Sequence, residues 1–207
     1  MRSVDLSQWP RREVFEFFSG MNNPFYTVTF PVDVTNLYRR VKEENLSFYY
    51  ALVYLCTKAV NQVEAFRYRL DEAGLPVLLE SRSPSFTDLH PGSELFHIVT
   101  MPCEGSLEDF CRLAKKTSQE QQCFIRMEDE TPDLIFFSCL PWMDVTGLTH
   151  EHDHCKDDAV PRISWGQYVD TNGQKQLHMT LEVNHRFIDG YHLGQFYQAL
   201  TQSIEQL

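Results

Sequence analysis

The stretch Leu181-Glu-Val-Asn-His-Arg-Phe-Ile-Asp-Gly-Tyr191 decides how the rest of the chain is interpreted. Before it, residues 176–183 alternate apolar and polar side chains and are predicted to form a strand. After it, residues 191–204 carry apolar side chains at helical spacing, which predicts the last helix. The turn between them therefore places the imidazole of His185 at the end of a strand. Asp189 follows four residues later, and then a glycine that permits tight backbone geometry.

This turn has two interpretations when it is taken alone. In the structural one, Asp189 caps the final helix by accepting hydrogen bonds from free backbone N–H groups, and His185 is a hydrogen-bonded turn residue. In the catalytic one, His185 lies where a reacting group can reach it. The motif His-x-x-x-Asp-Gly is short, so both interpretations stay open until the rest of the chain is considered.

Length and composition favour one folded domain over residues 1–207. A chain of 207 residues with 43% hydrophobic and 13% aromatic residues can bury about 70% of the surface that it exposes when unfolded. The formal net charge of −11 opposes binding to nucleic acids or to anionic membranes, because both need a basic face. No apolar run approaches the roughly 20 residues that span a bilayer.

The cysteines and the first residues indicate the compartment. The six cysteines contain no Cys-x-x-Cys pair, which favours reduced thiols in a cytosolic protein. The opening residues lack the features of a signal peptide. We therefore expect a cytoplasmic protein.

Helical and strand patterns are interspersed along the chain. Helices are expected at residues 5–20 (with Ser7 as its cap and Gly20 at its end), 35–44, 48–63 and 106–123. Strands are expected at residues 26–33, 85–90, 94–101, 133–140 and 161–169, and hairpins around residues 71–74 and 171–174. This order predicts an α/β fold, a single-domain mixed β-sheet with helices packed on it.

Five separated segments carry a resemblance to a known family. They are Gln8-Trp-Pro-Arg-Arg-Glu-Val-Phe-Glu-Phe-Phe18; Phe48-Tyr49 with Ala59-Val-Asn-Gln62 and Phe66-Arg67; Phe86-Thr-Asp-Leu-His90 with Glu94-Leu-Phe96; Ser138-Cys-Leu-Pro-Trp142; and the final turn and helix from Asn184 to Phe196. In these segments the chain resembles the chloramphenicol acetyltransferase family, within the CoA-dependent acyltransferases that share His-x-x-x-Asp-Gly. The resemblance runs nearly end to end. It implies that family's two-layer fold and a homotrimer with active sites at the subunit interfaces.

The resemblance also implies a reaction and roles for five residues. Acetyl would pass directly from acetyl-CoA, a co-substrate and not a permanently bound cofactor, to a hydroxyl of chloramphenicol or a related small acceptor. His185 would be the general base, since an unperturbed imidazole is mostly neutral at pH 7. Ser138 would donate a hydrogen bond to the oxyanion, and Ser164 would assist through a bound water. Arg11 would pair with Asp189 and hold the turn. Such an arginine–carboxylate pair is most specific in its geometry when it is bidentate.

Other positions match the substrate pockets of the family. His185 would come from one subunit and most of the acceptor pocket from its neighbour. The implied acceptor-pocket residues are Phe17, Phe18, Pro24, Tyr26, Phe96 and His150, and the residues implied near the CoA tunnel are Tyr49, Trp142 and Tyr168. Without the resemblance, each of these aromatics is as readily explained as ordinary core.

Several positions depart from the family pattern. Asn184 stands where a second histidine is usual, and Arg186-Phe-Ile replaces a small apolar stretch. The sequence from Asn184 to Gly190 resembles Asp-His-Arg-x-x-Asp-Gly of the dihydrolipoamide acyltransferase cores, which lack the other signatures above. Asn22 and His150 place polar groups where the family's pocket is apolar, and such groups disfavour an apolar ligand unless they are satisfied. The resemblance therefore specifies the chemistry more closely than the acceptor.

The tract His150-Glu-His-Asp-His-Cys155 places three histidines at alternate positions, a spacing that can ligate zinc or copper. The charged residues that flank it favour a solvated loop, and we expect no metal site. Two further hypotheses remain. One is the same chemistry on a thiol or a metabolite hydroxyl, and the other is a non-catalytic trimeric binding module of the same fold.

Overall fold

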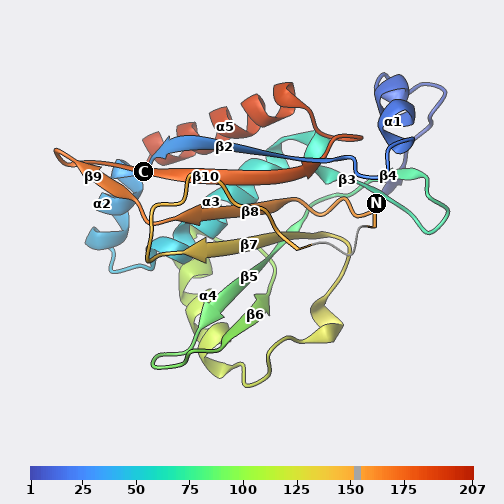
Figure 1. Cartoon of the computed structure of the whole chain (residues 1–207). Helices are drawn as coiled ribbons and strands as arrows, with labels where there is room; N and C mark the ends of the chain where they lie inside the picture. Colours follow the sequence, from blue (N-terminus) through green and yellow to red (C-terminus); the bar gives the residue numbers. More distant parts are fainter. Residues whose placement is uncertain (152–154) are drawn as a thin grey trace.

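The computed structural model describes residues 1–151 and 155–207, in which helices are layered on a large sheet (Figure 1). The α-helices are α1 (Arg12–Ser19), α2 (Thr35–Glu43), α3 (Phe48–Gln62), α4 (Leu107–Glu120) and α5 (Gly190–Glu205), and the 3₁₀ helices are η1 (Glu64–Arg67) and η2 (Met127–Asp129). The strands are β1 (Arg2–Ser3), β2 (Phe25–Asp33), β3 (Tyr68–Leu70), β4 (Pro76–Leu78), β5 (Ser83–Leu89), β6 (Phe96–Thr100), β7 (Leu134–Leu140), β8 (Arg162–Gly166), β9 (Val169–Thr171) and β10 (Gln174–Asn184).

The large sheet has the strand order β2-β10-β8-β7-β5-β6, with β9 paired to β10, and β1-β4-β3 form a small separate sheet. The neighbours β5, β7 and β8 run parallel, whereas the other pairs are antiparallel. The predicted mixed sheet with packed helices is therefore confirmed. The apolar run at residues 133–140 forms β7 inside the sheet. The strand β2 lies at the edge of the sheet, where a proline such as Pro31 is tolerated because one side of the strand has no partner strand.

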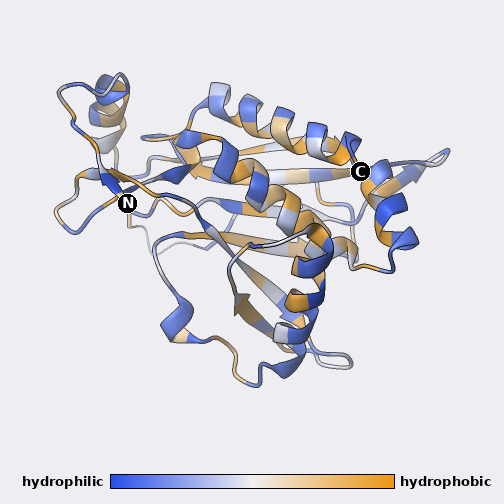
Figure 2. Cartoon of the chain, turned by 180° about the vertical axis from the view of Figure 1, so that it is seen from behind, coloured by the Kyte–Doolittle hydropathy of each residue, from blue (hydrophilic) through white to orange (hydrophobic). Residues whose placement is uncertain are grey.

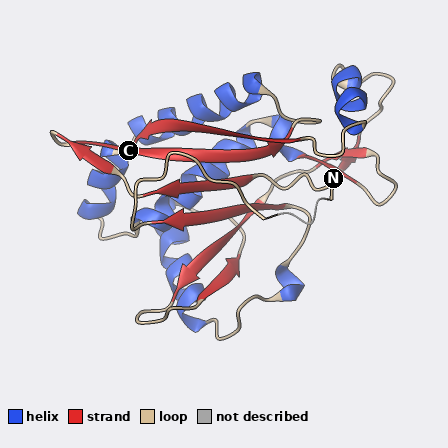
Figure 3. Cartoon of the chain, viewed as in Figure 1, coloured by secondary structure: helices blue, strands red, loops and turns tan. Residues whose placement is uncertain are grey.

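The two faces of the sheet differ in chemistry because neighbouring residues on a strand point to opposite faces. One row across the strands contains the buried Leu181, Ile163, Phe137 and Phe86, which belong to the hydrophobic core together with residues of α3 and α5. Figure 3 shows α3 and α5 behind the sheet, on the side of this core. The next row, on the opposite face, contains the polar residues described below, and only loops cross that face in Figure 1.

The helices over the core follow their sequence pattern. Ser47 caps α3, which is buried on most of its sides, through a hydrogen bond from the Tyr50 N–H to the Ser47 Oγ (3.4 Å). Ser106 and Asp109 form a capping box at the start of α4. Figure 2 shows hydrophobic and hydrophilic residues alternating along the helices, as expected when one face packs on the core.

The N-terminal segment differs from the prediction. The helix begins at Arg12, and Ser7 does not cap it, because the Ser7 N–H and Oγ both donate to the Asp5 carboxylate (2.9 and 2.7 Å). This local side-chain turn competes with helix formation. Gly20 does end the helix, as predicted. The two-residue strand β1 carries no periodicity and was not predicted.

The approach to the last turn matches the sequence pattern. Asn172 and Gly173 both have positive φ (54° and 87°) and connect β9 to β10 in a hairpin. The strand β10 is the longest in the structure and pairs with three neighbours. Within the described residues, none of the helices has the length and apolar character needed to cross a membrane.

Candidate active site

The turn from β10 into α5 is fixed first by Asp189. Its Oδ1 accepts a hydrogen bond from the Tyr191 N–H (3.0 Å), and its own N–H donates to the His192 Nδ1 (3.2 Å). Asp189 is thus the N-cap of α5, as in the structural interpretation of the sequence. Burial lowers the pKa of His192, which keeps its ring neutral and able to accept this hydrogen bond.

Arg11 binds the same turn from the N-terminal segment. Its Nη1 lies 2.6 Å from the Asp189 Oδ2, while its Nε and Nη2 donate to the carbonyls of Arg186 (2.9 Å) and His185 (3.1 Å). The pair is therefore not bidentate; two of the three hydrogen bonds hold the main chain instead. Burial opposes ionisation of Asp189, but the hydrogen bond from Arg11 and the positive charge of Arg11 outweigh it and hold the pKa below its usual value.

Asn184 and Arg186 bind the turn to another segment. The Asn184 amide donates to the carbonyls of Lys156 (3.0 Å) and Asp158 (2.8 Å). Arg186, only 2% exposed, donates to the Asp157 carboxylate (3.0 Å) and to the Lys156 carbonyl. The two residues that depart from the family pattern therefore fasten residues 156–158 to the turn that holds His185.

The His185 ring lies between two aromatic rings. It stacks on Phe18 with a centroid distance of 4.0 Å and an interplanar angle of 9°, and Tyr26 lies 4.4 Å away on a tilted plane. The His185 N–H donates to the Pro24 carbonyl (2.8 Å). Burial raises the pKa of Tyr26 to about 12, so its phenol is neutral. These contacts define the orientation of the imidazole.

Phe18, Pro24 and Tyr26 were expected in the acceptor pocket, most of which would come from the neighbour of the subunit that supplies His185. They contact His185 of their own chain, and their role in the pocket stays a prediction. Phe17 is 66% exposed, and its ring packs edge-on against the ring of Phe18. Sequence alone did not reveal this grouping, because it depends on the antiparallel pairing of β2 with β10.

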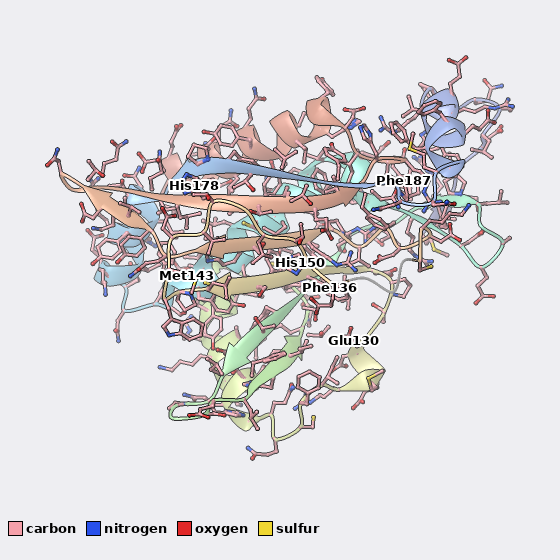
Figure 4. All side chains as sticks on the ribbon, in the orientation of Figure 1. Glu130, Phe136, Met143, His150, His178 and Phe187 are labelled. Carbon is pink, nitrogen blue, oxygen red and sulfur yellow. The ribbon has the colours of Figure 1, made fainter. Side chains whose placement is uncertain are left out.

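A cleft of about 1040 Å³ lies on the polar face of the sheet. Five predicted site residues line it: Ser138, Phe96, His150, Tyr49 and Trp142. The lining residues that sequence reasoning missed include Phe136, Glu130, Asp158 and Arg162. Figure 4 labels His150, Phe136 and Glu130 in this region. The missed signal was the strand period, since Phe136 and Arg162 lie two residues before Ser138 and Ser164 and so share their face.

Ser138 and Ser164 are register partners on the parallel strands β7 and β8. Ser164 is 1% exposed, and its Oγ has no hydrogen-bond partner among the described residues. Tyr168 does not line the cleft, and its ring packs against Tyr38 and Phe48 (5.5 and 5.7 Å); its place near the CoA tunnel stays a prediction.

Ser138 and His185 lie far apart within one chain. Ser138 pairs with Ser164, and Ser164 with Thr180, so the serine lies two strands away from β10. His185 follows Thr180 by five residues, so the two residues are separated by roughly 17 Å along the strands and about 10 Å across them. A base and an oxyanion donor must both lie about 3 Å from the reacting group. One copy of the chain therefore does not bring them together.

The histidine tract is only partly described. His150 lines the cleft, whereas His152 and His154 lie outside the described residues. Within residues 1–151 and 155–207, no group of three or more His, Cys, Asp or Glu side chains is arranged to hold a metal ion.

Comparisons with known proteins agree along the whole chain. The family model of chloramphenicol acetyltransferase matches residues 1–201. A chloramphenicol acetyltransferase of Staphylococcus aureus is 25% identical over 202 residues, which cover 96% of this chain and 93% of that protein. A solved chloramphenicol acetyltransferase superposes with a TM-score of 0.86 at 24% identity, covering 99% of this chain and 100% of the other.

The dihydrolipoamide acetyltransferase of Azotobacter vinelandii is a more distant structural match. It gives a TM-score of 0.67 at 14% identity and covers 93% of this chain and 85% of the other. The local likeness of residues 184–190 to such cores is therefore not matched by the fold as a whole, which is closer to the first structure.

Proposed function

The chain belongs to the chloramphenicol acetyltransferase family, and from that premise we propose that it transfers acetyl from acetyl-CoA to a hydroxyl of chloramphenicol or a related small acceptor. The observation that carries the proposal is the pair of prepared half-sites. One holds the His185 ring between Phe18 and Tyr26, and the other presents Ser138 in a cleft large enough for a small molecule.

The two half-sites meet when one copy of the chain inserts its His185 turn into the cleft of another. Such a head-to-tail contact forms a ring when the rotation between neighbouring copies closes, and a closed ring of three copies contains three equivalent sites. Large apolar side chains exposed around the cleft support such a contact, because exposed apolar patches mark interaction surfaces. They are Trp142, Phe96, Phe124, Leu95 and Met127.

In this site the neutral imidazole of His185 removes the proton from the acceptor hydroxyl as its oxygen attacks the thioester carbon of acetyl-CoA. The hydroxyl of Ser138 stabilises the negative charge on the former carbonyl oxygen. The carbon–sulfur bond then breaks, and the protonated imidazole returns its proton to the departing CoA sulfur. General base catalysis contributes about 10²–10⁴ in rate, and one oxyanion donor about 10²–10³.

Three further residues fit this assignment. The buried hydroxyl of Ser164 has spare capacity for a water near Ser138. Tyr49 and Trp142 line the cleft, where they would contact the CoA arm. Cys139, the neighbour of Ser138, is a poor nucleophile, because burial raises the pKa of its thiol to about 12. Transfer without a covalent acetyl-cysteine intermediate is therefore favoured.

The test is release of free CoA thiol from acetyl-CoA by the purified protein, with and without chloramphenicol. We expect acceptor-dependent release that falls by at least about 100-fold in His185→Ala and in Ser138→Ala. The oligomeric state of each variant, measured by light scattering, controls for lost assembly. A His185→Ala variant that stays assembled and keeps its rate would overturn the assignment of the base.

A further inference from the structure

The cleft is unusually acidic. Five carboxylate residues line it: Asp88, Glu94, Glu130, Glu151 and Asp158. Among the described lining residues, Arg162 is the single lysine or arginine. Its charge is already shared between Asp158, at 2.6 Å from its Nη2, and Glu182, at 3.8 Å from its Nε. This group of three side chains therefore keeps a net negative charge.

The carboxylates lie on both sides of one aromatic ring. Thr100, Ser85, Phe136 and Arg162 are register neighbours across β6, β5, β7 and β8. Glu130 lies at one end of this row, where it accepts a hydrogen bond from the Thr100 hydroxyl (3.0 Å), and Arg162 holds Asp158 at the other end. Figure 4 shows Glu130 and Phe136 on the same side of the sheet.

An aromatic face flanked by carboxylates is suited to a cation. The ring attracts positive charge through its quadrupole, and the carboxylates accept charge-assisted hydrogen bonds. The Arg162 guanidinium lies 5.6 Å from the Phe136 ring centroid, and its repulsion leaves the side of the ring toward Glu130 for a second cation. The side chains beside this ring therefore disfavour a neutral apolar group, which would strip water from Glu130 without replacing it.

This acidic wall lies close to the proposed reaction. Phe136 precedes Ser138 by two residues on the same face of β7, a separation of about 7 Å. A small molecule that contacts Phe136 through one group can therefore present a second group at Ser138. The two groups required are a cation and a hydroxyl.

The inserted turn of a second copy does not neutralise this wall with its nearest arginines. Arg11 is bound to Asp189, and Arg186 to Asp157, within their own chain. Arg12, next along the chain, is paired with Glu16. A positive charge to match Glu130 is thus left for the acceptor to supply.

We propose that the acceptor class of this protein is an amino alcohol, which places its ammonium group between Glu130 and the Asp158–Arg162 pair, over Phe136, and its hydroxyl at Ser138. The proposal rests on the proposed function, since it assigns the substrate of that same site. The reaction is unchanged: the hydroxyl oxygen takes the acetyl group, and the proton moves through His185 to the CoA sulfur.

The test compares two acceptors that share the aryl ring and the hydroxyls and differ at the nitrogen, in its charge and in its acyl group. One is chloramphenicol. The other is the amine left when its dichloroacetyl group is removed, converted to the N,N-dimethyl derivative. This derivative is cationic at pH 7, keeps the same aryl ring and hydroxyls, and has no nitrogen that forms a stable amide. Calorimetry on the assembled full-length protein gives the Kd of each, and CoA thiol release gives each kcat/KM.

We expect the cationic acceptor to bind at least about tenfold more tightly than chloramphenicol. Glu130→Gln should lower this Kd ratio about tenfold, because it removes charge while keeping the size of the side chain. Glu128→Gln is the matched control, as Glu128 is exposed on η2 and does not line the cleft. It should leave the ratio unchanged.

The outcomes separate this proposal from the function on which it rests. Tighter binding of chloramphenicol than of the cation, or a ratio that Glu130→Gln does not change, overturns the amino alcohol and leaves acetyl transfer standing. Preferred binding of the cation without release of CoA thiol from acetyl-CoA supports the acidic wall and contradicts the proposed function.

Discussion

Asp189 performs two structural tasks with its two carboxylate oxygens. Oδ1 caps α5 through the Tyr191 N–H, and Oδ2 receives Arg11. The cap and the ion pair, which the sequence presents as alternative explanations of this residue, coexist. Both fix the backbone that carries His185, since Arg11 also binds the His185 carbonyl.

At this scale the first prediction concerns Arg11. Arg11→Ala removes a charge-assisted hydrogen bond and two hydrogen bonds to carbonyls from a side chain that is 13% exposed. We expect a loss of about 2–3 kcal/mol in the free energy of unfolding, measured by urea titration. Arg12→Ala is the control, because Arg12 and Glu16 are each 52% exposed and such pairs contribute less than about 1 kcal/mol. Equal losses in the two variants would contradict the assignment.

The Arg11–Asp189 pair also predicts a pH dependence. In the folded state the pKa of Asp189 is lower than its ordinary value of 3.8. The stabilisation from this pair is therefore complete above the pKa that Asp189 has in the unfolded chain. It is lost as the pH falls through the lower, folded value. The difference in unfolding free energy between the wild type and Arg11→Ala should therefore be constant from pH 7 to about pH 5 and shrink below about pH 4. A difference that grows at pH 3 would show that Asp189 is not the partner that matters.

Residue roles were predictable where the family resemblance supplied them, and less so elsewhere. The contact between Arg11 and Asp189 was expected from the resemblance, and the structure contains it, with one nitrogen on the carboxylate. The importance of Glu130 and Arg162 was not foreseen. Glu130 reaches the cleft from the end of η2, which it follows, and Arg162 from β8, and only the strand order brings them to Ser138.

At the scale of elements, the β10–α5 turn is coupled to the segment at residues 156–158. Asn184 and Arg186 make this coupling, and Asp158 at its far end lines the cleft. The segment that shapes the cleft and the turn that carries His185 are therefore joined by hydrogen bonds and an ion pair.

Arg186 should be a positioning residue for this connection. We expect Arg186→Ala to lower the free energy of unfolding by on the order of 3 kcal/mol. It should also raise KM for the acceptor more than it lowers kcat, because the cleft wall loses its anchor. Asp157→Asn is the comparison; it removes the charge but keeps the backbone hydrogen bonds, and its effect should be clearly smaller. If KM for the acceptor is unchanged in Arg186→Ala at a temperature where it is folded, the coupling does not position the wall.

Hydrophobic periodicity predicted most elements, including β7 inside the sheet and the hairpin before β10. It failed at the N-terminus, where Ser7 was expected to cap a helix that starts only at Arg12. The reason is local: Asp5 offers Ser7 a hydrogen-bonded turn that propensity alone does not weigh against the helix. The strand β1 is too short to have a period.

At the scale of the whole molecule, the predicted site is divided into two half-sites on one chain. The sequence indicated residues for both, through its resemblance, but not which residues share a half-site. The division of the residues between the half-sites depends on the register from β10 through β8 to β7. This register places Ser138 and Thr180 in one row across these strands, although they are more than 40 positions apart in the chain. Register of this kind is set by the core-facing row and the hairpins together, and short motifs do not encode it.

The central claim is that His185 of one copy acts with Ser138 of another, and subunit mixing tests it most directly. His185→Ala and Ser138→Ala chains, co-expressed with different affinity tags and purified through both, give mixed oligomers. In a mixed trimer one of the three interfaces joins an intact His185 to an intact Ser138, so CoA thiol release should recover to about one third of the wild-type rate. If the mixed oligomers stay as inactive as either variant alone, the two residues do not share a site across an interface.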